Sequence, residues 1–93
     1  MTIKEFLNEL EKHKCSFSCK TGLIRHYLPT GEYYCPITLL CHKKNMGNYQ
    51  TIEAYDAGKK IGLRTRQITS IMHAADFSSP VSKIRKHLLR LCK

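Results

Sequence analysis

The chain has no apolar run that approaches the roughly 18 to 20 residues of a membrane-spanning helix, because charge or proline interrupts each candidate within a few positions. It also lacks the apolar segment of about 7 to 15 residues that a secretory signal needs near the N-terminus. Internal repeats, low-complexity tracts and linkers are absent. These absences predict one domain spanning residues 1–93, located in the cytoplasm and without membrane contact.

Acidic residues are scarce, since seven Asp and Glu face 16 Lys and Arg and leave a net charge of +9. The acids form no pair suited to general acid–base catalysis, and three of them fall within residues 5–11. No glycine-rich phosphate loop or serine nucleophile motif occurs. Cys41 and His42 are sequence neighbours, which does not give a thiolate–imidazole pair the geometry it needs. The sequence therefore predicts a protein that is not an enzyme and has no cofactor.

The cysteines are odd in number, five in all, and no secretory signal precedes them. We therefore expect reduced thiols and no disulfide framework. A zinc site is the alternative, because the spacing of Cys15 and Cys19 lies within the range that zinc ligands use. Cys35 and Cys41 are a poor second pair, since they lie six positions apart and no CxxC motif occurs. The prediction is no metal, with these four cysteines as the candidate ligands of the alternative.

The first 35 residues predict a helix followed by a hairpin. Thr2 and Glu5 have the spacing of a capping box, and apolar residues then recur at helical spacing to about His13. Residues 22–28 and 32–35 are rich in β-branched and aromatic residues and flank a Pro-Thr-Gly turn, which indicates a β-hairpin. Residues 16–19 could add a third short strand. Three hairpin tyrosines could stack on bases beside Arg25 and His26, with at least one expected in the core: Tyr27, Tyr33 and Tyr34.

The remainder predicts helices. Pro36 at a first helical position favours a short helix ending near Lys44, and residues 65–75 have the apolar spacing of another. Thr51 is the expected N-cap of a helix that Gly62 ends, with three apolar positions: Ile52, Tyr55 and Ile61. Ser79 followed by Pro80 predicts the start of the last helix. The fold class is therefore α+β, with an N-terminal helix, a β-hairpin and a C-terminal helical subdomain that contains a helix-turn-helix-like corner.

That corner is predicted at residues 54–73. Gly58 is the small residue where two helices would cross, and Gly62 follows four positions later in the turn. Ile68 and Ile71 then face the core. The segment resembles the helix-turn-helix of phage repressors, although many small α domains use the same arrangement as a purely structural corner. The resemblance implies that six outward residues donate to phosphates or base edges: Arg64, Thr65, Arg66, Thr69, Ser70 and His73.

The positive charge is regional, because residues 57–93 contain nine Lys and Arg and one acid, and so carry +8 of the net +9. On the predicted last helix, basic residues recur at i, i+3 and i+7 with no acid from position 80 to 93, which suits a phosphate backbone or an acidic partner. A merely soluble basic helix is the alternative. The predicted binding residues besides those of the corner are Lys59, Lys60, Lys83, Lys86 and Arg90.

As a whole, the chain resembles small proteins of phages and mobile elements, among which the anti-CRISPR proteins form a functional class. The resemblance is one of type and implies an inhibitor that blocks a guide-RNA or DNA path on a CRISPR surveillance complex, a host protein complex in the bacterial cytoplasm. A helix-turn-helix transcriptional regulator is the alternative, and a module that binds an acidic protein is a third. A repressor would be a dimer on a palindromic site, but no long helix is left for dimerisation, so we predict a monomer.

Overall fold

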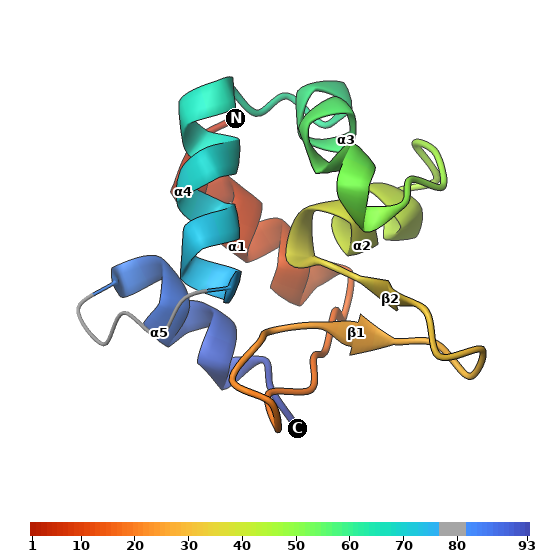
Figure 1. Ribbon diagram of the computed structural model, residues 1–93. Coiled ribbons are helices and arrows are strands. Elements are labelled where there is room, and N and C mark those ends of the chain that lie inside the picture. The colour runs from red at the N-terminus through yellow and green to blue at the C-terminus, as the bar shows by residue number, and fades with distance from the viewer. Residues whose placement is uncertain (77–81) are drawn as a thin grey trace.

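The computed structural model describes residues 1–76 and 82–93 (Figure 1). Their elements follow in the order α1 (Ile3–Lys12), β1 (His26–Tyr27), β2 (Tyr33–Tyr34), α2 (Pro36–Lys43), the 3-10 turn η1 (Thr51–Glu53), α3 (Ala54–Lys60), α4 (Thr65–Asp76) and α5 (Lys83–Arg90). The two strands form one antiparallel sheet. The architecture is α+β with an N-terminal helix followed by a hairpin, which confirms the predicted fold class.

The first helix begins as predicted. The Thr2 hydroxyl accepts a hydrogen bond from the Glu5 backbone N–H at 3.0 Å, and the Glu5 carboxylate accepts one from the Thr2 N–H at 3.0 Å. Hydrogen bonding by the Thr2 backbone N–H, and secondly by the Thr2 side chain, lowers the pKa of Glu5, because a hydrogen bond to the carboxylate favours its ionised form. The helix then buries Phe6, Leu7 and Leu10 along one stripe. Local sequence is sufficient to define this element.

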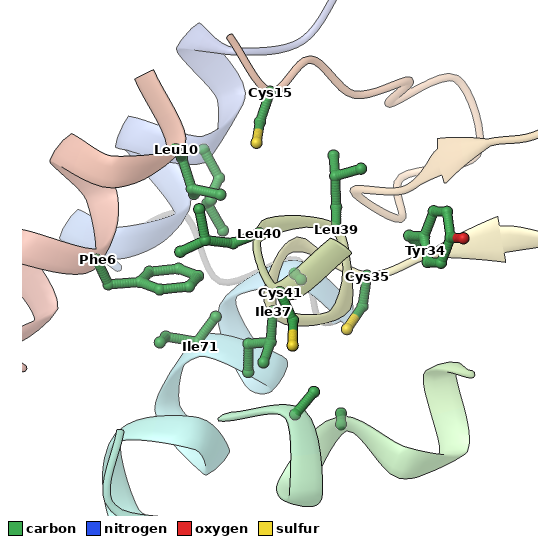
Figure 2. Close-up of a cluster of buried hydrophobic side chains, with 14 of the residues drawn as sticks. Phe6, Leu10, Cys15, Tyr34, Cys35, Ile37, Leu39, Leu40, Cys41 and Ile71 are labelled. Carbon is green, nitrogen blue, oxygen red and sulfur yellow. The ribbon is translucent and has the colours of Figure 1, made fainter. Parts of the chain in front are cut away.

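The core is organised around α2. Its residues from Pro36 to Cys41 are all buried, which is the pattern of a helix surrounded by other elements rather than lying on a surface. Figure 2 shows Phe6 and Leu10 of α1 on one side of α2 and Ile71 of α4 approaching Ile37 from another. Helix α2 contacts α1, α3, α4 and β2. It therefore sets the positions of α3 and α4, which form the predicted corner.

The hairpin is shorter than predicted. Only two residues per strand pair, His26 with Tyr34 and Tyr27 with Tyr33. The expected strand over residues 22–28 begins late, at His26, because the Ile24 N–H donates to the Ala75 carbonyl near the end of α4, 3.0 Å away. The expected third strand over residues 16–19 is present only as two isolated bridges, one from Phe17 to Cys92 and one from Ser18 to Arg25. Backbone groups of this region thus serve tertiary contacts.

The approach to α3 also differs from the prediction. Thr51 is not an N-cap, because its hydroxyl donates to the Tyr33 carbonyl at 3.0 Å and the segment from Thr51 to Glu53 is a 3-10 turn. The periodicity of an α-helix therefore does not apply before Ala54. Two of the three expected apolar positions are exposed: Ile52 in the 3-10 turn is 87% exposed, and Tyr55 in α3 is 39% exposed. Ile61 is buried as expected.

The last helix starts later than predicted. The expected cap at Ser79 and Pro80 lies outside the described residues, and α5 begins at Lys83 with Ser82 as its N-cap. The Ser82 hydroxyl accepts from the Arg85 N–H at 3.2 Å, which satisfies one of the free donors of the first turn. Leu88 is buried, and Ile84 packs partly buried against the core. Ile84 and Leu88 therefore form the side of this helix that packs on the core.

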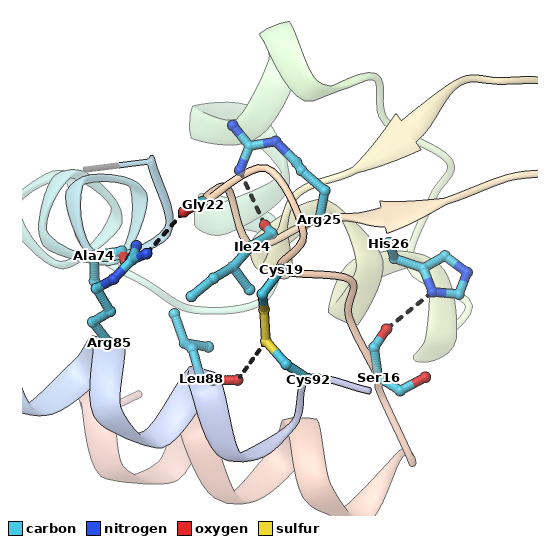
Figure 3. Close-up of a disulfide and its surroundings, with 10 residues drawn as sticks. All are labelled: Ser16, Cys19, Gly22, Ile24, Arg25, His26, Ala74, Arg85, Leu88 and Cys92. Carbon is cyan, nitrogen blue, oxygen red and sulfur yellow. Dashed lines mark hydrogen bonds between the residues drawn. A yellow bond between two sulfur atoms is a disulfide. The ribbon is translucent and has the colours of Figure 1, made fainter. Parts of the chain in front are cut away.

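The expectation of reduced cysteines is wrong for two of the five. Cys19 and Cys92 form a disulfide with their Cα atoms 6.0 Å apart, across 73 positions of sequence (Figure 3). The C-terminal segment pairs with Phe17, whose N–H donates to the Leu91 carbonyl at 3.0 Å and whose carbonyl accepts from the Lys93 N–H at 2.9 Å. This pairing brings the two sulfurs together. The other three cysteines are buried free thiols: Cys15, Cys35 and Cys41.

Candidate nucleic-acid interface

Helices α3 and α4 approach each other closely at Gly58. A Cβ atom built there would lie 2.5 Å from both Cγ1 and Cδ1 of Ile68 and 3.5 Å from Cγ2 of Ile37. Real Cβ atoms do not come that close to carbon, so any larger residue would force the helices or Ile68 to move. The predicted role of Gly58 as the crossing residue is therefore confirmed.

We expect Gly58→Ala to lower the free energy of unfolding by up to about 2 kcal/mol, because an overpacking cost of about 1 to 3 kcal/mol is offset by the roughly 1 kcal/mol that alanine gains in a helix. Ile68, the side chain that would have to move, is fully buried. Urea denaturation of Gly58→Ala, Ile68→Ala and the double variant measures the coupling. The double variant should be more stable than the sum of the two single losses predicts; strict additivity would show that the two side chains do not collide.

The turn after α3 is closed by Gly62. Its φ is +99°, a conformation that favours glycine, and its N–H donates to the Lys59 carbonyl at 3.1 Å. The next N–H, of Leu63, donates to the Gly58 carbonyl at 2.8 Å. This pair of bonds is a Schellman motif, which satisfies two carbonyls at the end of α3. The predicted turn glycine is confirmed.

The start of α4 is held by the first residue of the chain. The Arg64 N–H donates to Gln67 Oε1 at 2.8 Å, and Gln67 Nε2 donates to the Met1 carbonyl at 2.8 Å. The Met1 amino group in turn donates to the Gly62 carbonyl at 3.0 Å. The first turn of α4 contains no acidic residue. The positive end of the α4 dipole therefore has no acidic side chain in its own first turn, and Arg64 and Arg66 beside it are exposed.

The six predicted outward residues of the corner lie on the accessible side of α4, five of them exposed and Thr69 half-buried. Two differ from the expectation that all donate. The Thr69 hydroxyl donates to the Thr65 carbonyl and the Ser70 hydroxyl to the Arg66 carbonyl, each at 3.0 Å. Their hydrogens are thus committed to the helix backbone, and what they present outward is an acceptor oxygen.

Tyr55 is a site residue that was expected only as an apolar position of its helix. Its hydroxyl lies 2.8 Å from Thr69 Oγ1, and since the Thr69 hydrogen goes to the backbone, Tyr55 is the donor of this bond. The bond joins α3 to α4 on their solvent side. Lys59 follows four residues later on the same side of α3. In the sequence, only the four-residue spacing of Tyr55 and Lys59 indicates that they share the solvent side of α3. An aromatic residue in a helix is more often expected in the core, so this spacing is easily overlooked.

The predicted basic face is divided into two groups. The first, here the corner cluster, consists of four exposed side chains on both sides of the Gly62 turn: Lys59, Lys60, Arg64 and Arg66. The second, here the α5 row, is also exposed: Lys83, Lys86 and Arg90. Helix α5 packs at the C-terminal end of α4 (Figure 1), about 18 Å from the α4 N-terminus at 1.5 Å per residue. The two groups therefore lie near opposite ends of α4.

Helix α1 contains three of the seven acids, and two of these carboxylates lie beside basic side chains. Glu11 Oε1 lies 3.0 Å from Nε2 of His87 on α5. Glu9 lies 3.3 Å from His13 Nε2 and 3.6 Å from Lys44 Nζ through its two oxygens. These contacts attach α1 to α5 and α2 and leave the basic residues of the corner cluster without a carboxylate partner among the described ion pairs.

The cysteines do not form a metal site. Within residues 1–76 and 82–93, no three His, Cys, Asp or Glu side chains lie close enough together to hold a metal ion. Cys19 is bonded to Cys92 and so is not available as a ligand. Burial raises the pKa of Cys15 to about 11 and also raises the pKa of Cys41, which keeps both as thiols at neutral pH. The zinc alternative therefore has no geometric support.

Comparison of the chain with protein-family models, with curated proteins and with solved structures finds no match. No helix in the described part of the chain is long and apolar enough to cross a bilayer.

Proposed function

We propose that the protein acts by binding nucleic acid, without catalysis, through the α3–α4 corner. The observation that carries the proposal is the corner cluster: four exposed cations surround one glycine turn at the positive end of α4. Helix N-termini and arginine side chains are the groups that proteins direct at phosphates. Their convergence at one corner suits the backbone of a duplex.

In this arrangement the corner cluster contacts phosphates, and α4 offers its outer side chains to the bases. Arg64 and Arg66 extend from the first turn, where a helix entering the major groove makes its base contacts. Thr69 and Ser70 present acceptor oxygens, which suit the amino groups of adenine and cytosine. Tyr55 supports Thr69 from α3. The α5 row, at the far end of α4, would strengthen attachment to a longer or bent nucleic acid.

The biological role that we propose is inhibition of an RNA-guided complex of the CRISPR type, by occupying its guide-RNA or DNA path. All five described helices bury side chains in the same core, so none is left as a separate dimerisation element. A monomer that blocks a path needs no palindromic site. A helix-turn-helix regulator is the second candidate, favoured by the Gly58–Ile68 crossing and the Gly62 turn. A sequence-specific dimer on a palindrome would select the second.

We expect Arg64→Glu combined with Arg66→Glu to abolish most duplex binding. With four phosphates neutralised, log K against log[salt] should have a slope near −3.6 in the native protein, and removal of two of the contacts should bring it to about −1.8. Fluorescence anisotropy with a labelled duplex from 50 to 200 mM salt measures both. Lys12→Glu combined with Lys14→Glu is the matched control, because it changes the net charge equally at exposed positions away from the corner. Equal loss in the control, or a flat salt response in the native protein, would refute the proposal.

A further inference from the structure

A cationic pocket of about 310 Å³ is lined by residues of the loop after α1, of β1 and of the C-terminal segment. Figure 1 shows these segments away from the α3–α4 turn. None of the described residues that line it is acidic. Besides Phe17, the lining residues are Ser16, Ser18, Lys20, His26, Tyr27 and Lys93. We refer to it as the Lys20–Lys93 pocket.

The disulfide assembles this pocket from residues far apart in sequence. Lys20 directly follows Cys19 and Lys93 directly follows Cys92, so the bond between the two sulfurs sets both lysines at one opening. The Lys93 N–H donates to the Phe17 carbonyl at 2.9 Å, which fixes the C-terminal segment beside Phe17, another lining residue of the pocket. Neither lysine forms an ion pair within the described residues. Their charges are therefore available to an anion.

Two ring side chains of β1, His26 and Tyr27, also line the pocket. His26 is held by a 3.0 Å hydrogen bond from Nδ1 to the Ser16 carbonyl, which directs its other ring nitrogen away from that bond (Figure 3). Tyr27 is 45% exposed, and its ring lies 5.8 Å from that of Tyr33 on the same face of the hairpin. Tyr34, by contrast, is buried, so one of the three hairpin tyrosines serves the core as expected. An exposed ring beside two ammonium groups is the combination that binds a base and its phosphate.

We propose that the Lys20–Lys93 pocket binds one nucleotide of a single-stranded nucleic acid, with its phosphate between the two lysines and its base stacked on Tyr27. This site is separate from the corner cluster and goes beyond the duplex binding proposed above. A duplex would keep its bases stacked on one another, whereas a single strand can turn one base onto a tyrosine ring. An acidic peptide would use the lysines but would gain nothing specific from the ring.

The test measures fluorescence anisotropy of a labelled eight-nucleotide oligothymidylate with the oxidised full chain. Lys20→Ala combined with Lys93→Ala should weaken binding about tenfold through lost phosphate contacts. Tyr27→Ala should weaken it about fivefold or more, and Tyr27→Phe should retain native affinity because the stacking face remains. Lys12→Ala combined with Lys14→Ala is the matched control and should have little effect. Unchanged affinity in the Lys20 and Lys93 variant would overturn the proposal.

Two further measurements separate this site from the corner. Duplex affinity should stay unchanged in the Lys20 and Lys93 variant, and oligothymidylate affinity should persist in the Arg64→Glu, Arg66→Glu variant. Loss of oligothymidylate binding only in the latter would assign all binding to the corner.

Adenosine monophosphate should compete weakly, since it fills one subsite. Competition by oligoglutamate as strong as that by oligothymidylate at equal charge would reject the nucleotide in favour of an acidic peptide. Cys19→Ser with Cys92→Ser should lose affinity as the lysines separate, and an undiminished affinity in a folded sample would reject the pocket geometry.

Discussion

Reduction of the Cys19–Cys92 disulfide is expected to lower the free energy of unfolding by up to about 4 kcal/mol in the loop-entropy model. The bond spans 73 positions, so it constrains most of the unfolded chain. A chain this short buries a limited apolar area and depends more than a larger domain on such a constraint. The pairing of Phe17 with the C-terminal segment would open as well, because the disulfide is its covalent support.

Urea denaturation with and without dithiothreitol measures this effect. The variant that combines Cys19→Ser with Cys92→Ser is the control, and its midpoint should match that of the reduced native protein and ignore the reductant. Alkylation of the folded protein should label Cys19 and Cys92 only after reduction, because the disulfide blocks both sulfurs. Cys15 should stay unlabelled in both states, since it is buried and its raised pKa leaves little thiolate. Equal midpoints for the oxidised and reduced native protein would contradict the prediction.

The parts of the fold that the sequence predicted correctly depend on contacts between close neighbours in the chain. The capping box of Thr2 and Glu5 spans three residues, and the Gly62 turn closes hydrogen bonds over five at most. Gly58 and Ile68 are ten positions apart but belong to one corner whose helical spacing fixes their meeting. For such elements, residue type and spacing contain the determining physical information.

The parts that it did not predict depend on pairings between distant segments. The disulfide could not be inferred, because only the pairing of Phe17 with the last residues places Cys92 beside Cys19. The expected strand over residues 22–28 was shortened by the bond of Ile24 to α4, which lies about fifty positions away. Tyr55 belongs to the candidate site through its hydrogen bond to Thr69, fourteen positions away on α4. Regional charge likewise did not show that α4 separates the corner cluster from the α5 row.

Arg85→Met is expected to lower the free energy of unfolding by about 3 kcal/mol, since each hydrogen bond from a charged donor contributes about 1.5 to 3 kcal/mol and desolvation of the arginine offsets part of the sum. Arg85 is 8% exposed. Its Nη1 donates to the Ala74 carbonyl at 2.9 Å and its Nη2 to the Gly22 carbonyl at 2.8 Å (Figure 3). Arg85 therefore joins the end of α4 to the loop before the hairpin and belongs to the interior, although the regional charge count included it.

Two variants make this prediction sharp. Lys86→Met removes the same charge at the exposed neighbouring position and should change stability by no more than about 0.5 kcal/mol. Arg85→Lys keeps the charge but cannot donate from two nitrogens to two carbonyls, so its urea midpoint should fall between those of Arg85→Met and the native protein. A midpoint for Arg85→Met equal to that of Lys86→Met would refute the structural role. Duplex affinity of folded Arg85→Met should equal that of the native protein, because Arg85 is buried and does not reach a phosphate on the surface.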